Sequence, residues 1–168
     1  MATDMSPITE GQIFDLTEFF TGETRAWGVF EDRFGRVRRR FTVLIRGAWA
    51  GDTFVMTEDF VYDDGATEHR VWRLRRASAC TFLATTEHCI GAAMVHCADA
   101  TIIMRYKFNL QLKSKSVVVD FDDRIYRIDR RNAMNRATVS KWGIKIGEVT
   151  LFFAKAALAT GQRTAAAA

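Results

Sequence analysis

Alternation of apolar and polar side chains is the dominant pattern of this chain. From position 37 to 49 the odd positions are mostly apolar, and the even positions are mostly basic or hydroxylated. A period of two is typical of a strand with one face on a core and the other in water. The same alternation returns at 54–62, 70–74, 102–112 and 117–125. These segments are predicted to be half-buried strands.

Short turn signals separate the predicted strands. Asp63-Asp64-Gly65 is a tight-turn sequence between the runs 54–62 and 70–74. We expect a three-residue loop there, with Met56 opposite Leu74 and Glu58 diagonal to Arg70. A two-residue loop would turn one of the two faces over, so the register stays open at this stage.

The remaining segments complete the set of strands. We expect a first strand at 25–31, two short strands within 79–97 that are broken near Gly91, and final strands at 133–142 and 144–155. Thr9-Glu10-Gly11-Gln12 has the spacing of a capping box, and apolar residues follow at helical intervals. The capping-box spacing and the helical intervals together predict an amphipathic helix from Thr9 to Phe20.

The predicted fold class is all-β: one antiparallel barrel of nine or ten strands with a short N-terminal helix. Closing the sheet leaves no strand edge unpaired, and no βαβ spacing or internal repeat points elsewhere. Residues 1–22 would form a lead-in and the helix, 23–155 the barrel, and 156–168 an alanine-rich tail that is frayed helix or disorder. A barrel of this size is filled by side chains or holds one small apolar ligand.

Composition is typical of a single globular domain, and the distribution of charge limits the classes of binding partner. The chain has 168 residues, 48% of them hydrophobic, and a net charge of +4. Much of the basic excess lies at 33–46, on the expected solvent face. Phe41 falls on the opposite face from Arg38 and Arg40, so the aromatic interleaving of a nucleic-acid surface is absent from this strand. We expect no nucleic-acid partner.

The compartment is left undetermined by the sequence. Three cysteines give no disulfide framework, which favours a reducing compartment. No apolar run is long enough to cross a bilayer, and the acidic residues Asp4 and Glu10 argue against a secretory signal. A presequence already removed would leave no trace, so an organelle stays open, and so does peripheral contact with a membrane.

Several polar residues fall on the apolar faces and are the candidate ligand-binding residues. Charges that face a barrel interior must be paired or change their protonation. An arginine between two carboxylates could hold the carboxylate of a fatty acid or another small anion; alternatively, the set is a buried ion pair that closes one end of the barrel. The residues are Glu58, Tyr62, Arg70, Trp72, Tyr106 and Asp123.

Two further groups are weaker candidates. Asn135, Arg136, Lys141 and Glu148 would form a polar rim around a ligand mouth, or else serve as ordinary turn and solvent-facing residues. The repeated dipeptides at 88–89 and 96–97, each His-Cys, would form a metal site only if a hairpin at Gly91 brought them together. Their spacing matches no familiar zinc pattern, so no metal and no cofactor is expected.

No motif indicates an enzyme. The chain has no G-x-S-x-G, no P-loop and no G-x-G-x-x-G sequence. The carboxylate pairs at 63–64 and 122–123 are adjacent in sequence, so on a strand their members point to opposite faces and form no acid–base dyad. We expect a non-enzymatic protein, with Glu58 or Asp123 as acid or base if a lipid-modifying activity exists.

Several sequence blocks resemble a known family. AWGVFEDRFGRVRRRF, EDFVYDDG followed by RVW, FDD, and MNRATVSKWGIKIGEVTLFF occur in an order similar to a small bacterial family known as a domain of unknown function. Its members are usually lipid-anchored or periplasmic, and its fold is calycin-like, related in shape to lipocalins. The resemblance covers 19–155, and 76–101 departs from it. It implies an apolar or lipid ligand and carries over no catalytic residues.

Two functions follow from these observations. The first is a lipocalin-like carrier of an apolar ligand such as a fatty acid or an isoprenoid. The alternative is an accessory or scaffold subunit of a larger assembly that keeps the barrel without ligand chemistry, which the divergent segment 76–101 and the missing anchor sequence favour.

Overall fold

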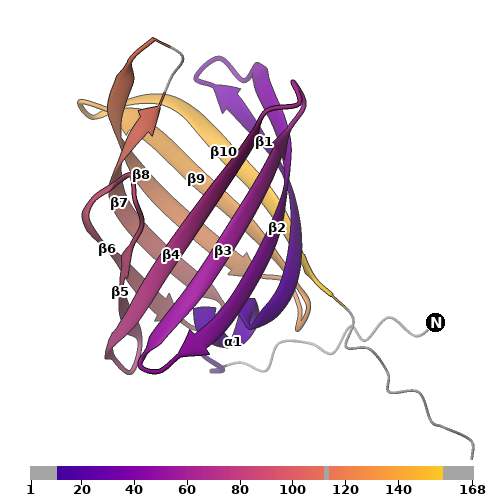
Figure 1. The fold of residues 1–168 in the computed structure, drawn as a ribbon, viewed down its shortest axis with the longest axis vertical. Coiled ribbons are helices and arrows are strands. Elements are labelled where there is room, and N and C mark those ends of the chain that lie inside the picture. Colours follow the sequence, from indigo (N-terminus) through magenta and orange to yellow (C-terminus); the bar gives the residue numbers. More distant parts are fainter. Residues whose placement is uncertain (1–10, 112–113, 157–168) are drawn as a thin grey trace, which may run out of the picture.

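The fold is a closed antiparallel β-barrel with one short helix at one end (Figure 1). The computed structural model describes residues 11–111 and 114–156. Its elements are α1 (Leu16–Phe20), β1 (Gly22–Asp32), β2 (Val37–Ala50), β3 (Thr53–Tyr62), β4 (Thr67–Ser78), β5 (Thr81–Thr85), β6 (Cys89–Ala98), β7 (Thr101–Gln111), β8 (Ser116–Arg127), β9 (Asn132–Lys141) and β10 (Ile144–Lys155). Successive strands pair, and β1 pairs with β10 to close the barrel. The predicted all-β barrel is confirmed.

The apolar faces of the strands converge inside the barrel, as their alternation predicts. Val43 and Trp72 are buried in one cluster, with Phe60 packed against it. Phe108 lies in a second cluster, and Phe121 packs against that one. Burial of apolar side chains on one face of every strand is the main favourable contribution to this fold.

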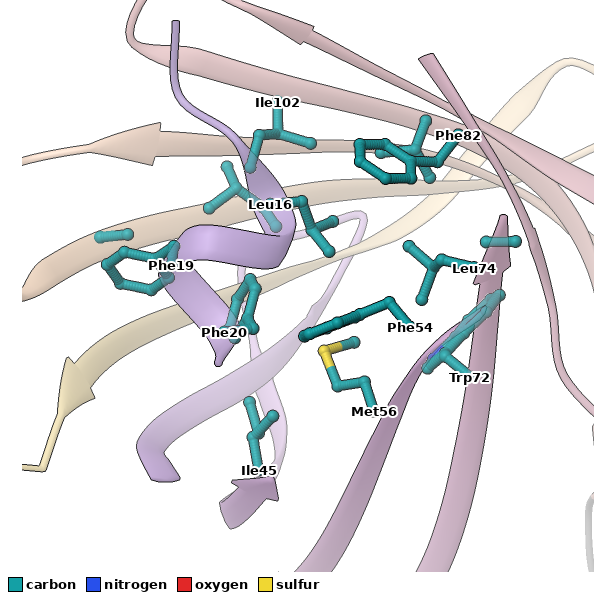
Figure 2. Close-up of a cluster of buried hydrophobic side chains, with 14 of the residues drawn as sticks. Leu16, Phe19, Phe20, Ile45, Phe54, Met56, Trp72, Leu74, Phe82 and Ile102 are labelled. Atoms are coloured by element: carbon teal, nitrogen blue, oxygen red, sulfur yellow. The ribbon is translucent and has the colours of Figure 1, made fainter. Parts of the chain in front are cut away.

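Helix α1 closes one end of the barrel. Leu16, Phe19 and Phe20 of α1 are buried among side chains of the barrel wall (Figure 2). The helix backbone comes so close to β2 that a Cβ at Gly47 would lie 2.3 Å from the carbonyl oxygen of Phe20. Only glycine fits at this contact, because backbone atoms cannot move aside as a flexible side chain can.

Both ends of α1 are tied to the barrel by polar contacts. Asp15 is the N-cap and accepts a hydrogen bond of 2.8 Å from the backbone N–H of Thr17. Arg76 of β4 donates to the same carboxylate over 2.9 Å. At the other end, Nζ of Lys155 donates to the carbonyl oxygen of Phe19 over 2.6 Å. The helix is therefore held in place although it is only five residues long.

The helix prediction was too long. Residues 11–15 are not helical, and the helix begins at Leu16. Gly11 has a φ of +87°, which is outside the helical region, and Asp15 supplies the cap that the sequence analysis placed at Thr9. Thr9 itself, the lead-in before it and the tail at 157–168 lie outside the described residues.

Two predicted details of the sheet were wrong. The turn between β3 and β4 spans three residues as expected, but the register differs by two: Met56 lies opposite Trp72, and Glu58 lies directly opposite Arg70. The break predicted at Gly91 falls instead between β5 and β6, at 86–88. Gly91 lies within β6, where the register with β7 shifts between Ile90 and Met94, so this glycine serves an irregularity in a strand and not a turn.

The end of the barrel away from α1 is open. In the described part of the chain no helix covers it, and the inward-facing Phe30, Phe60, Leu110 and Val117 near this end are only half-buried. The hairpins β1–β2, β3–β4, β5–β6 and β9–β10 turn at this end. No helix among the described residues is long and apolar enough to span a bilayer.

Candidate functional site

A polar cluster lies on the inner wall of the barrel, between the core near α1 and the open end. The register of β3 and β4 sets Glu58 opposite Arg70. Nη1 of Arg70 lies 3.8 Å from a carboxylate oxygen of Glu58, and Nη2 donates to Glu68 over 2.5 Å. The arginine between two carboxylates that the sequence predicts is therefore present, but the second carboxylate beside it is Glu68.

Aromatic rings surround the guanidinium of Arg70. Its Cζ lies 4.9 Å from the ring centroid of Phe60 and 4.7 Å from that of Phe108. Both are cation–π distances, which stabilise a charge that is largely removed from water. The Nε of Arg70 is buried and has no hydrogen-bond partner in the described residues. The polar cluster therefore keeps one unused donor among aromatic side chains.

Glu68 is a member of the cluster that the sequence analysis missed. It accepts a hydrogen bond of 2.8 Å from the hydroxyl of Tyr62 and is also bonded to Arg70. Burial opposes ionisation of Glu68, but the charge of Arg70 and these bonds outweigh it and lower its pKa. The signal was in the sequence, because Glu68 lies two positions before Arg70 and so on the same face of β4.

Asp123 is the most perturbed acid of the inner wall. Burial, with a smaller contribution from the nearby Glu58, raises its pKa to about 7 against the opposing effect of a hydrogen bond from the side-chain amide of Asn135. Burial likewise raises the pKa of Glu58, although Arg70 acts in the opposite direction. Burial and the charge of Asp123 raise the pKa of Tyr106. The four residues predicted to gather here are within electrostatic reach of one another.

Trp72 and Tyr106 form the aromatic side of the cluster. Their rings meet edge to face at 5.4 Å, and Tyr106 stacks on Phe121 at 4.9 Å with nearly parallel planes. Trp72 is buried in the core cluster. It supports the wall beneath the polar groups, and a hydrogen bond from its side chain acts to lower the pKa of Glu58.

The predicted rim residues lie in three different places. Lys141 ends β9 at the open end, and its Nζ lies 4.7 Å from the ring centroid of Trp142. Asn135 is only 3% exposed and points inward, where it binds Asp123 and the carbonyl of Arg124, so its placement at a rim was wrong. Arg136 lies on the outer wall and pairs with Glu148, which also accepts from Lys145 over 2.6 Å.

The two His-Cys dipeptides are not brought together. Cys89 lies opposite Phe108, whereas Cys97 lies opposite Ile102, at the other end of the same pair of strands. In residues 11–111 and 114–156 no three of the histidine, cysteine and acidic side chains gather closely enough to hold a metal ion. The hypothetical metal site at Gly91 therefore has no geometric support.

The outer wall carries a row of exposed apolar side chains that we call the outer belt. The register aligns these five residues across six neighbouring strands, with Thr42 of β2 between the first and second of them. An open groove of about 590 Å³ lies along part of this row. The outer belt consists of Val61, Trp27, Phe152, Met134 and Tyr126.

Comparison with known proteins shows a fold likeness to two solved structures. The S-type phycobiliprotein lyase CPES from Guillardia theta superposes with a TM-score of 0.61 at 9% identity, over 86% of this chain and 94% of that one. A protein of unknown function from the DUF3598 family of Nostoc punctiforme PCC 73102 gives 0.62 at 11% identity, over 90% of this chain and 52% of that one. At these identities the likeness concerns the fold alone.

The sequence itself matches one family over almost its whole described length. No curated protein matches the chain. The sequence profile of DUF3833, described as a protein of unknown function, matches residues 5–155, which span the helix and all ten strands of the barrel. The chain therefore belongs to the DUF3833 family.

Proposed function

We propose that this barrel binds an apolar small molecule through its open end and carries it without changing it chemically. The observation that supports this proposal is the lining of the open end. Half-buried apolar side chains such as Phe30, Leu110 and Val117 lie between this end and a polar cluster deeper inside. Concave, mostly apolar sites with a few converging polar groups are the usual form of small-molecule sites.

The chemistry of the inner wall favours a carrier over an enzyme. One solved structure of this fold is a phycobiliprotein lyase, so the architecture is compatible with an enzymatic role. Here, however, burial raises the pKa of both Cys89 and Cys97, which disfavours the thiolate that a cysteine nucleophile needs. Glu68, the acid nearest the mouth, is engaged by Arg70 and Tyr62.

The polar cluster also limits which head groups the ligand can have. Arg70 already contacts Glu58 and Glu68, and Asp123 adds a third carboxyl group for a single guanidinium. A fatty-acid carboxylate would have to displace one of these partners and would meet the other acids. An uncharged hydroxyl can instead exchange hydrogen bonds with the protonated form of Asp123, whose pKa is about 7. An isoprenoid alcohol therefore suits the site better than a fatty acid.

Incubation with a lipid mixture followed by native mass spectrometry tests the carrier proposal. We expect one lipid to be retained per chain, with geranylgeraniol retained better than palmitate. Val117→Trp should abolish retention, because Val117 faces inward near the open end. Val118→Trp is the matched control, since Val118 is exposed on the outer face of the same strand. A wild-type barrel that retains no lipid, or equal retention by both variants, contradicts the proposal.

The outer belt supports a second candidate function, that of a subunit in an assembly. An exposed apolar row of this length, interrupted only by Thr42, is typical of an interaction surface. The row contains no charged side chain, so a second copy of the chain can cover it without burying an unpaired charge. The proposed assembly is therefore a dimer that joins the two outer belts.

Light scattering on a sizing column tests the dimer. We expect the wild type to be dimeric and Trp27→Asp, in the middle of the outer belt, to be monomeric. Leu83→Asp should remain dimeric, because Leu83 is similarly exposed but lies on β5, away from the outer belt. A wild type that stays monomeric at high concentration, or a Trp27→Asp variant that stays dimeric, overturns this candidate.

A further inference from the structure

Two aromatic side chains project from the open end of the barrel. Trp142 is 86% exposed and Phe34 is 69% exposed, the highest values among the large exposed hydrophobic residues of the described chain. Phe34 lies in the turn between β1 and β2, and Trp142 in the turn between β9 and β10. Because β1 pairs with β10, the two hairpins are neighbours, and the backbone N–H of Arg33 donates to the carbonyl of Ile146 over 3.1 Å.

Each of these rings has a cation beside it. Cζ of Arg33 lies 4.7 Å from the ring centroid of Phe34, and Nζ of Lys141 lies 4.7 Å from that of Trp142. Each hairpin therefore presents an apolar ring and a positive charge together. We call Phe34, Arg33, Trp142 and Lys141 the tip residues.

The surroundings of the tip residues are basic. Residues 31–40 carry five arginines against the two acids Glu31 and Asp32, and residues 141–148 carry two lysines against Glu148. The neighbouring β3–β4 turn adds Asp63 and Asp64, which pair with arginines of β2 at 3.9 and 3.3 Å. Glu87 in the β5–β6 turn is a further acid at this end, and Arg38 and Lys145 are also paired, with Asp32 and Glu148. The remaining positive charge is therefore concentrated at Arg33, Arg36 and Lys141, for which no acidic partner lies within 4 Å in the described residues.

The exposed tryptophan is also held in a strained backbone conformation. Trp142 has a φ of +52°, which is unfavourable for any residue with a side chain. The fold gains no burial in return, because the ring is almost entirely in solvent. Trp142 and Gly143 are the two central residues of the β9–β10 hairpin, and a two-residue turn of this kind requires a positive φ at both. The turn therefore accounts for the backbone conformation. What points to a role outside the fold is the exposed indole ring at a position where asparagine or glycine is usual.

We propose that the open end docks on the surface of an anionic lipid bilayer, with the rings of Phe34 and Trp142 inserted among the head groups and acyl chains. Arg33, Lys141 and the arginines nearby would lie at the level of the lipid phosphates. Aromatic rings with a polar or charged neighbour are favoured at this boundary, and each basic residue near an anionic surface adds to binding. The mouth of the barrel would then face the membrane.

The form of the tip favours a bilayer over a protein partner. Two separate rings on two turns offer far less area than the roughly 800 Å² per partner of a stable protein interface. Binding to a bilayer needs no complementary surface, because the free energy of shallow insertion and that of charge attraction both contribute to the affinity. The excess of arginine and lysine selects anionic lipid in particular.

Vesicle flotation tests the apolar part of the proposal. We expect the wild type to float with vesicles of phosphatidylcholine containing a quarter of phosphatidylglycerol, and to stay behind with phosphatidylcholine alone. The double variant Phe34→Ser/Trp142→Ser should lose binding by about tenfold or more, because binding scales with the inserted apolar area. The control is Leu83→Ser/Met94→Ser, which removes two exposed apolar residues that are paired on the outer wall and should float like the wild type.

A charge series and a fluorescence readout complete the test. Arg33→Gln/Lys141→Gln should weaken binding to the anionic vesicles by about fivefold for each charge removed, and Arg75→Gln/Arg130→Gln, exposed near the closed end, should not. Brominated lipid should quench tryptophan emission in the wild type and much less in Trp142→Phe. Equal flotation of the tip and control variants, binding to phosphatidylcholine alone, or no flotation at all would each overturn the proposal. None of these readouts requires a ligand inside the barrel, so they are independent of the carrier function.

Discussion

Replacing Arg70 with methionine is expected to lower the free energy of unfolding by about 2–4 kcal/mol near pH 8, because it leaves two partly buried carboxylates without their cation. Methionine keeps most of the apolar volume between Phe60 and Phe108, so the loss reports mainly on charge. Chemical denaturation followed by far-UV circular dichroism measures it.

The pH dependence of this loss identifies its cause. In the wild type the pKa of Glu68 is lowered, so the stability that it gains from Arg70 is present above the ordinary value of 4.5 and is lost as the pH falls below it. The difference between Arg70→Met and the wild type should therefore narrow towards about pH 4. Arg73→Met, exposed on the outer face of the same strand, should change little at either pH. A loss that is the same at both pH values would show that ring packing, and not charge, is what Arg70 supplies.

The barrel could be predicted from the sequence because its strands are long and half-buried. A period of two over ten or more residues, as in β2, β7 and β8, leaves little ambiguity about which side chains face inward. The wrong predictions concern features that depend on only a few residues. The register of β3 and β4 depends on which three residues form the turn, here 63–65, and the start of α1 depends on whether Thr9 or Asp15 acts as the cap.

The candidate site was partly predictable for the same reason. Polar residues at inward positions can be read from the alternation, and Glu58, Arg70, Tyr106 and Asp123 do share the interior. The hydrogen-bonding partners of these residues could not be assigned from the sequence, because they depend on which strands pair and in which register. Asn135 reaches Asp123 from β9. The exposed tip residues looked like ordinary turns in the sequence, since exposure becomes informative only once the open end of the barrel is known.

Asp123→Asn is expected to stabilise the protein by about 1–3 kcal/mol near pH 8 and to change little near pH 4. The pKa of Asp123 is raised from 3.8 to about 7, so the folded chain keeps a proton that the unfolded chain releases between these two values. The free energy of unfolding of the wild type must therefore fall as the pH rises through this window, by up to about 4 kcal/mol. Asparagine is uncharged at every pH and can still accept the hydrogen bond from Asn135, so the penalty disappears.

The neighbouring aspartate supplies a control of opposite sign. Asp122 faces outward and lies 3.0 Å from Arg105 and 3.2 Å from Arg124. Burial opposes the ionisation of Asp122, but hydrogen bonds from these arginines outweigh it and lower its pKa. Asp122→Asn should thus lower stability near pH 8. If both variants shift stability in the same direction, the burial of Asp123 is not what raises its pKa. If the signs differ as expected, the raised pKa of Asp123 lowers the stability of the fold as the pH rises from 3.8 to about 7. Below about pH 7 the carboxyl group keeps its proton and supplies a hydrogen-bond donor inside the barrel, as a ligand with an uncharged polar head requires.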